Sequence, residues 1–221
     1  MKTILITGAG TGLGKELALA YAKRGDRIIL VGRTKESLNK VKDLIKMTKG
    51  SSLVAMCDIS DGQAVKKLIE GLARIEKIDM LINNAGIGYF GNLQDLSVEE
   101  ISQMIDTNIK GTIFMTKEVL PIFLEHQSGK IMNIISTAGL RGKVRETVYV
   151  ASKFAVRGFT ESLIKELEHT SIKVSAVYMG GMNTPFWEGS DFIKDPSRLK
   201  SAKQVAIEIV EREDEEEMII S

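Results

Sequence analysis

The chain has 221 residues, with 30 Lys and Arg against 29 Asp and Glu, so its formal net charge is +1. This balance argues against binding to nucleic acids or anionic membranes, because both need a clear basic excess. Apolar residues make up 43% of the chain and charged residues 27%, which excludes global disorder. The single cysteine, Cys57, cannot form an intrachain disulfide, and two histidines leave little for a metal site, so none is predicted.

Short apolar segments alternate with helical patterns along the chain. The predicted elements are, in order, a strand at 4–6, a helix at 13–21, a strand at 27–31, a helix at 38–45, a strand at 53–56, a helix at 65–72, a strand at 80–82, a helix at 98–125, a strand at 131–135, a helix at 148–168 and a strand at 174–178. Continuous apolar strands separated by helices indicate a parallel sheet covered on both faces. The sequence predicts a single doubly wound α/β domain, a Rossmann fold, over residues 1–221.

The C-terminal part is less regular. A helix is predicted at 202–212, and residues 218–220 are expected to form a short edge strand. The acidic run at 211–217 is interpreted as a solvated helix end or loop, with an interaction tail as the alternative.

No apolar run approaches the ~18 residues of a membrane span. The apolar residues 4–6 imitate the start of a signal peptide, but Thr7 and Gly8 interrupt them before an apolar core of ~7 residues is reached. We therefore expect no removed leader and a cytoplasmic protein.

A glycine-rich turn follows the first strand and opens the first helix, with the sequence Thr-Gly-Ala-Gly-Thr-Gly-Leu-Gly at 7–14. Glycines let the backbone approach a pyrophosphate, and the helix N-terminus offers its amides and the positive end of its dipole. The spacing departs from the generic G-x-G-x-x-G fingerprint. On its own, a purely structural turn is an equally good interpretation.

A second motif, Asn-Asn-Ala-Gly at 83–86, ends the fourth strand. Ligands bind at the carboxyl ends of strands in such sheets, although asparagine pairs also stabilise ordinary turns.

Tyr149 and Lys153 are spaced to share one helix face. A lysine ammonium near a phenol lowers the phenol pKa from its reference of ~10, which produces a general acid or base. Ser136 lies 13 residues before Tyr149, and its hydroxyl could bond a carbonyl oxygen, with Thr137 as a competitor for that role. A solvated surface pair and a capping serine are the alternatives.

Taken together, these motifs resemble the short-chain dehydrogenase/reductase family. The family pattern is T-G-x-x-x-G-x-G, then N-N-A-G, an Asn in the following helix, a Ser, and Y-x-x-x-K. This sequence has the matching residues at 7–14, 83–86, Asn108, Ser136, and Tyr149 with Lys153, so the resemblance covers residues 2 to about 187. It implies hydride transfer between a nicotinamide cofactor and a carbonyl or alcohol.

The resemblance also implies roles for single residues. Tyr149 would be the acid in reduction and the base in oxidation, and Lys153 would lower its pKa and bond the nicotinamide ribose. Ser136 would hold the substrate oxygen, and Asn108 would hold a water of the proton relay. The implied cofactor-binding residues are Gly8, Gly10, Thr11, Gly12, Leu13, Gly14, Arg33, Asp58, Asn84, Ala85, Gly86, Tyr149, Lys153 and Thr184.

Cofactor choice depends on the end of the second strand, where an acidic residue would accept the ribose hydroxyls of NAD. Residues 31–35 read Val-Gly-Arg-Thr-Lys and contain no acid. Arg33 can bind a 2′-phosphate, with Thr34 or Lys35 assisting. We therefore predict NADP(H), with NAD(H) as the alternative.

The sequence departs from the family after the sixth strand, where Gly180 replaces the usual proline. Residues 180–200 are expected to form a substrate loop or lid whose apolar members are Met182, Phe186, Trp187 and Phe192. The basic residues Arg141, Lys143 and Arg145 are interpreted as solvated surface, with attraction of an acidic substrate as the alternative.

The sequence thus predicts an NADPH-dependent reductase of a small, largely apolar ketone or aldehyde. The alternatives are an NAD-dependent alcohol dehydrogenase and a protein that senses dinucleotides without turnover. The resemblance also implies a homodimer or homotetramer, paired through the helices at 98–125 and 149–168.

Overall fold

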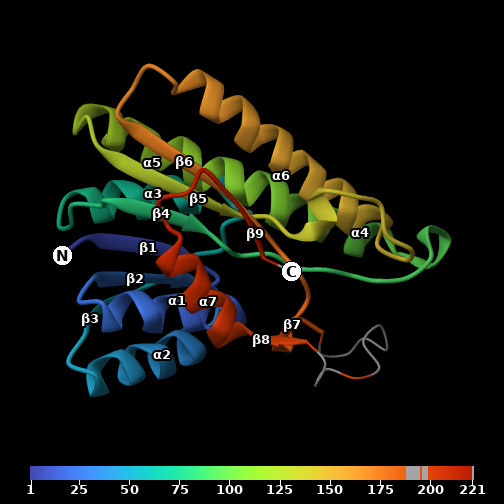
Figure 1. The fold of residues 1–221 in the computed structure, drawn as a ribbon, viewed down its shortest axis with the longest axis horizontal. Helices are drawn as coiled ribbons and strands as arrows, with labels where there is room; N and C mark the ends of the chain where they lie inside the picture. Colours follow the sequence, from blue (N-terminus) through green and yellow to red (C-terminus); the bar gives the residue numbers. More distant parts are fainter. Residues whose placement is uncertain (188–194, 196–198, 221) are drawn as a thin grey trace.

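The computed structural model describes residues 1–187, 195 and 199–220. A seven-stranded sheet forms its centre, with the order β3-β2-β1-β4-β5-β6-β9 (Figure 1). Its strands are β1 (Thr3–Thr7), β2 (Arg27–Gly32), β3 (Ser51–Met56), β4 (Met80–Asn83), β5 (Gly129–Ile134), β6 (Ile172–Met179) and β9 (Glu217–Ile220). All pairs in this sheet are parallel. The predicted α/β Rossmann fold is confirmed.

Helices cover both faces of the sheet. They are α1 (Gly12–Lys23), α2 (Lys35–Met47), α3 (Gly62–Ala73), α4 (Val98–Met104), α5 (Thr112–Glu125), α6 (Thr147–Glu166) and α7 (Ala202–Glu211). Successive side chains of a strand point to opposite faces. Accordingly, Ile4 packs in one core with Leu17 of α1 and Val205 of α7, whereas Leu5 packs in the other with Met115 of α5.

The long helix predicted at 98–125 is interrupted. A π-helical segment, η2 (Ile105–Gly111), separates α4 from α5. Within it, the Asn108 side chain bonds to the backbone of Ile87. The hydroxyl of Thr112, the first residue of α5, donates to the Asn108 carbonyl at 2.9 Å. Such π-helical turns occur frequently at functional sites, and this one joins the helix to the segment that follows β4.

The predicted edge strand at 218–220 is confirmed, since β9 pairs with β6. Gly180 extends this pairing, because its amide donates to the carbonyl of Ile220 at 2.8 Å. Proline has no amide hydrogen, so the family's usual residue could not make this bond.

The acidic segment is mostly exposed, as predicted, but Glu213 is buried. It forms ion pairs with Lys2 at 2.8 Å and with Arg24 at 3.0 Å. The expectation of a wholly solvated segment is therefore wrong at Glu213, because two cations from the N-terminal part of the chain compensate its charge. No helix in the described part of the chain is long and apolar enough to cross a membrane.

Short 3₁₀ segments and a two-stranded parallel ribbon complete the part of the fold that the structure describes. The 3₁₀ segments are η1 (Leu93–Asp95), η3 (Thr137–Gly139) and η4 (Pro185–Trp187), and the ribbon consists of β7 (Met182–Asn183) and β8 (Lys200–Ser201). The strand order reverses between β1 and β4, which is the point where open α/β sheets bind ligands.

Candidate active site

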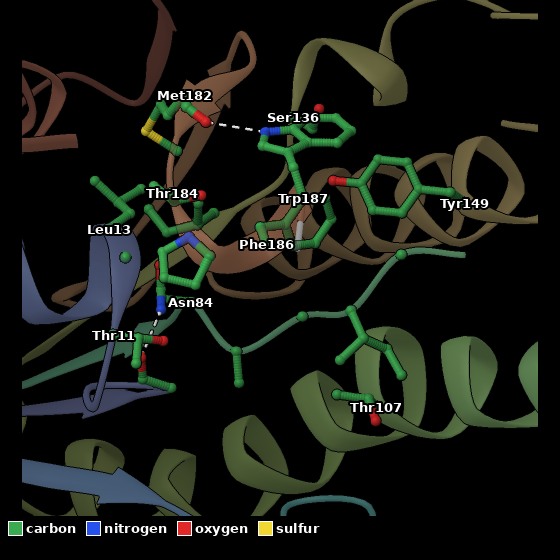
Figure 2. Close-up of a pocket in the computed structure, with 18 of the residues that line it drawn as sticks. Thr11, Leu13, Asn84, Thr107, Ser136, Tyr149, Met182, Thr184, Phe186 and Trp187 are labelled. Carbon is green, nitrogen blue, oxygen red and sulfur yellow. Dashed lines mark hydrogen bonds between the residues drawn. The ribbon is translucent and has the colours of Figure 1, made fainter. Parts of the chain in front are cut away.

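A cleft of about 480 Å³ lies at the carboxyl ends of the strands, next to the reversal of strand order (Figure 2). Gly8 follows β1, Asn84 follows β4, Ser136 follows β5 and Met179 ends β6, and all four line it. Every predicted site residue lines this cleft except Gly10, Gly14 and Asn108. One cavity thus collects motifs that are far apart in the sequence.

In the glycine-rich turn, the backbone lies so close to neighbouring backbone segments that side chains would not fit. Gly8 has a φ of +64°, and a Cβ there would lie 2.9 Å from the Cα of Ala85. A Cβ on Gly14 would lie 2.3 Å from the carbonyl oxygen of Gly8. Gly14 therefore packs the helix against the turn and does not face the cleft, and Gly10 likewise packs against Ser37.

The N-terminus of α1 opens into the cleft through Gly12 and Leu13. Its N-cap residue, Thr11, makes no side-chain capping bond, and the first turn holds no acidic residue. Amides and the positive dipole end at such a terminus favour an anion. The turn and the helix terminus together fit a dinucleotide pyrophosphate.

Asn84 fixes the turn to the end of β4. Its side-chain amide donates to the carbonyl of Thr7 at 2.9 Å, while the Thr7 hydroxyl accepts from the amides of Asn84 and Ala85, both at 3.0 Å. The two predicted nucleotide motifs therefore hold each other in place.

Tyr149, Lys153 and Ser136 meet on one side of the cleft, and each is at most 6% exposed. Figure 2 shows the Tyr149 hydroxyl directed toward the side of the cleft that holds Ser136 and Trp187. The Lys153 ammonium donates to the carbonyl of Ile134 at 3.2 Å, and its nitrogen lies 5.7 Å from the centroid of the Tyr149 ring.

The pKa of Tyr149 is raised, contrary to the expectation from sequence. Burial is the largest cause, a hydrogen bond with Ser136 lowers the pKa, and the charge of Glu146 raises it further. Burial also lowers the pKa of Lys153 to about 8. The nearby Lys153, whose ammonium donates to the Ile134 carbonyl, does not lower the Tyr149 pKa. Tyr149 therefore keeps its proton at neutral pH, as a proton donor must.

Ser136 has an unusual backbone conformation, with φ 138° and ψ 153°. Only glycine adopts this region readily, and other residues there cost about 1–3 kcal/mol. The Ser136 hydroxyl accepts from the amide of Ala138 at 3.1 Å. Such strain is typical of positions where function dictates the direction of a side chain.

Asn108 lies beside the cleft and does not line it. Its amide nitrogen donates to the carbonyl of Ile87 and to the hydroxyl of Ser152, and its oxygen accepts from the amide of Ile87. These bonds make it a positioning residue for the segment after β4. Its predicted role in holding a water stays a prediction, and the neighbouring Thr107 is the residue that lines the cleft.

Arg33 and Asp58 also line the cleft. The Nη1 atom of Arg33 lies 3.9 Å from the Oδ2 atom of Asp58. The Arg33 side chain is 62% exposed, so its guanidinium is available to a ligand. Asp58 also accepts hydrogen bonds from the amide and hydroxyl of Ser60.

An aromatic cluster covers the Tyr149 side of the cleft. The ring centroid of Tyr149 lies 5.7 Å from that of Phe186 and 5.5 Å from that of Phe90. Phe90 also stacks on Trp187 at 4.9 Å. The lid residues Phe186 and Trp187 were predicted from sequence, whereas Phe90 was missed because nothing local marks it. Phe192, also predicted, lies outside the described residues.

Comparison with known proteins agrees with this site. The chain matches the family described as short chain dehydrogenase over residues 2–191. An uncharacterized oxidoreductase of Listeria monocytogenes is 38% identical over 190 residues, which cover 85% of this chain and 77% of that protein. This chain belongs to the short-chain dehydrogenase/reductase family. As a member it is an oxidoreductase that binds NAD(P) and acts on a small substrate.

Solved structures of short-chain dehydrogenases and reductases share the fold. A variant of actinorhodin polyketide ketoreductase with NADPH is 29% identical, with a TM-score of 0.87 over 95% of this chain and 89% of that one. The closed form of a serine dehydrogenase complexed with NADP+ is also 29% identical, with a TM-score of 0.88 over 99% of this chain and 94% of that one.

Proposed function

We propose that this chain is an NADP(H)-dependent reductase of a ketone or aldehyde on a small, largely apolar molecule. The observation that carries the proposal is the meeting of Tyr149 and Ser136 in the cleft that the glycine-rich turn also lines. The bound nicotinamide would supply the hydride. The protein's own groups then have to bind the carbonyl and provide a proton.

Each of the three buried residues would have a separate task. The Ser136 hydroxyl would donate to the carbonyl oxygen, where negative charge develops as the reaction proceeds. The Tyr149 phenol is protonated at neutral pH and would give its proton to the same oxygen, although burial raises its pKa and so makes it a weaker acid. The charge on Lys153 would stabilise the resulting phenolate and hold the cofactor ribose.

The preference for NADP(H) rests on Arg33. It lines the end of the cleft, is largely exposed, and is followed by Thr34 and Lys35 with no acid among them. A guanidinium binds phosphate oxygens in a bidentate manner. The solved relatives that hold NADPH or NADP+ support the same preference.

Side-by-side titration with NADPH and NADH tests this proposal. The chain's single tryptophan, Trp187, lines the cleft, so its fluorescence reports binding directly. We expect tight binding of NADPH, weaker binding of NADH, and oxidation of NADPH by ketones or aldehydes. A preference for NADH would contradict the cofactor assignment, and binding without any turnover would favour a dinucleotide sensor.

We also propose that the chain forms a homodimer or homotetramer through α5 and α6. Phe154 of α6 and Leu124 of α5 are large apolar side chains left 42% and 43% exposed. Light scattering that shows a monomer at micromolar concentration would contradict this proposal.

A further inference from the structure

Glu146 is a buried carboxylate for which the reaction described above has no use. It lines the cleft, is 4% exposed, and lies one helical turn before Tyr149. It occupies the N-cap position of α6 without making a capping bond. Within the described part of the chain its carboxylate accepts no hydrogen bond, and its ion-pair partner is Lys143, with 3.8 Å between the charged atoms.

This arrangement leaves the carboxylate under-satisfied. A carboxylate with little access to water and no hydrogen bond from the protein is unfavourable, although the oxygens of Glu146 are not completely buried. Burial raises the pKa of Glu146, and Lys143 counters that shift only in part. Lys143 is also the outer member of the pair, since its side chain is 27% exposed against 5% for Glu146. The Glu146 carboxylate can therefore accept a hydrogen bond from a further donor.

Two rings of the aromatic cluster, those of Phe186 and Trp187, line the same cleft as Glu146. The amide of Gly91 donates to the carbonyl of Arg145 at 2.9 Å, which fastens the Phe90 segment next to Glu146. Phe90 and Phe186 then pack against Tyr149, three residues further along the chain. Aromatic rings attract a cation through their faces, and a carboxylate pairs with it. Together they form the kind of surroundings that bind an organic ammonium group.

We propose that Glu146 binds a protonated amino group of the substrate, so that the substrate is an amino ketone or amino aldehyde. This inference rests on the proposed carbonyl reductase activity, and it narrows the substrate class of that same site. The carbonyl would lie at Tyr149 and Ser136, and the ammonium one helical turn away at Glu146. Lys143 competes with the substrate for the carboxylate and so weakens binding.

A matched pair of ketones tests the inference. β-Dimethylaminopropiophenone is cationic at neutral pH, and isohexanophenone is a neutral ketone of nearly the same shape. Binding of each to the NADPH-loaded protein is followed by Trp187 fluorescence, and KM and kcat are measured for both. We expect the cationic ketone to bind about tenfold to a hundredfold more tightly, the range for a hydrogen-bonded charge pair.

Three variants test whether Glu146 is the residue that binds the cationic ketone. Glu146→Gln removes the preference for the cation, because it raises the KM and Kd of the cationic ketone toward those of the neutral ketone. Lys143→Met strengthens binding of the cationic ketone, which a purely structural ion pair would not do. Glu161→Gln is the matched control, because Glu161 is an exposed acid on the same helix, paired with Arg157, and should change neither affinity.

The outcomes separate this inference from the proposed function. If both ketones bind and react equally well, or if Glu146→Gln leaves the preference intact, the ammonium site is wrong while the reductase activity stands. If the cationic ketone binds preferentially through Glu146 but neither ketone is reduced with NADPH or NADH, the ammonium site stands and the reductase activity is wrong. If Glu146→Gln fails to fold, the tightening expected in Lys143→Met decides.

Discussion

Reversing the charge at Arg33 should exchange the cofactor preference. A charge-assisted hydrogen bond contributes about 1.5–3 kcal/mol, but the Arg33 side chain is 62% exposed, so solvent screening reduces its share to about 1–1.5 kcal/mol. Arg33→Asp removes that contact and adds a screened repulsion of about 1 kcal/mol from the 2′-phosphate. The new carboxylate can also accept the ribose hydroxyls of NADH. The two effects on NADPH sum to about 2–2.5 kcal/mol, or about 30- to 70-fold in the ratio of the two dissociation constants, to which any gain in NADH affinity adds.

The assay is titration of Trp187 fluorescence with NADPH and with NADH, on the wild type and on Arg33→Asp. Arg74→Asp is the control, because it reverses the same charge on an exposed residue that does not line the cleft. We expect the control to keep the wild-type ratio. A folded Arg33→Asp protein whose ratio stays within about twofold of the wild type would refute the argument that Arg33 selects the cofactor.

Three further predictions follow from the strained serine and from two titratable groups. Ser136→Gly should be more stable than Ser136→Ala by about 1–2 kcal/mol in denaturant unfolding, because glycine relieves the strain at φ 138°, while both variants lose turnover; equal stabilities would contradict the strain. Although burial raises the pKa of Glu213, Lys2 and Arg24 outweigh it and the net shift is downward. The stability from these ion pairs is therefore present above the unfolded-state pKa of ~4.3 and is lost as pH falls, so the advantage of the wild type over Glu213→Gln should shrink on acidification; a constant difference would argue against this assignment. Because burial lowers the pKa of Lys153 to about 8, its charge disappears as pH rises through that value, and NADPH affinity should fall there in the wild type and equally in Tyr149→Phe; affinity that is flat through this range would show that the charge is not used.

The fold was predictable because its strands are continuous apolar runs. Short apolar segments such as 4–6 and 28–31, separated by helical patterns, are typical of central strands in a covered parallel sheet, and the structure has them there. The break at 105–111 was not predictable, because the bonding of Asn108 to Ile87 that accompanies it is a tertiary contact.

The site was predictable where its residues form motifs of fixed spacing in the sequence. The glycine-rich turn and the spacing of Tyr149 and Lys153 are local signals, and the structure brings them to one cleft. Burial is not a local property, so the sign of the Tyr149 pKa shift could not be predicted from its distance to Lys153. Phe90 and Glu146 escaped notice for the same reason, because only the folded chain brings Glu146 to the cleft and Phe90 against the Tyr149 ring.

The most direct test of the account compares the wild type with Tyr149→Phe, which removes one hydroxyl and keeps the ring and its packing. NADPH oxidation is measured with a panel of ketones and aldehydes, and NADPH binding is measured on the same preparations. We expect the variant to bind NADPH like the wild type and to lose turnover by about 10²-fold or more, the contribution of a positioned general acid. Turnover that survives in Tyr149→Phe would contradict the proposal that this phenol supplies the proton.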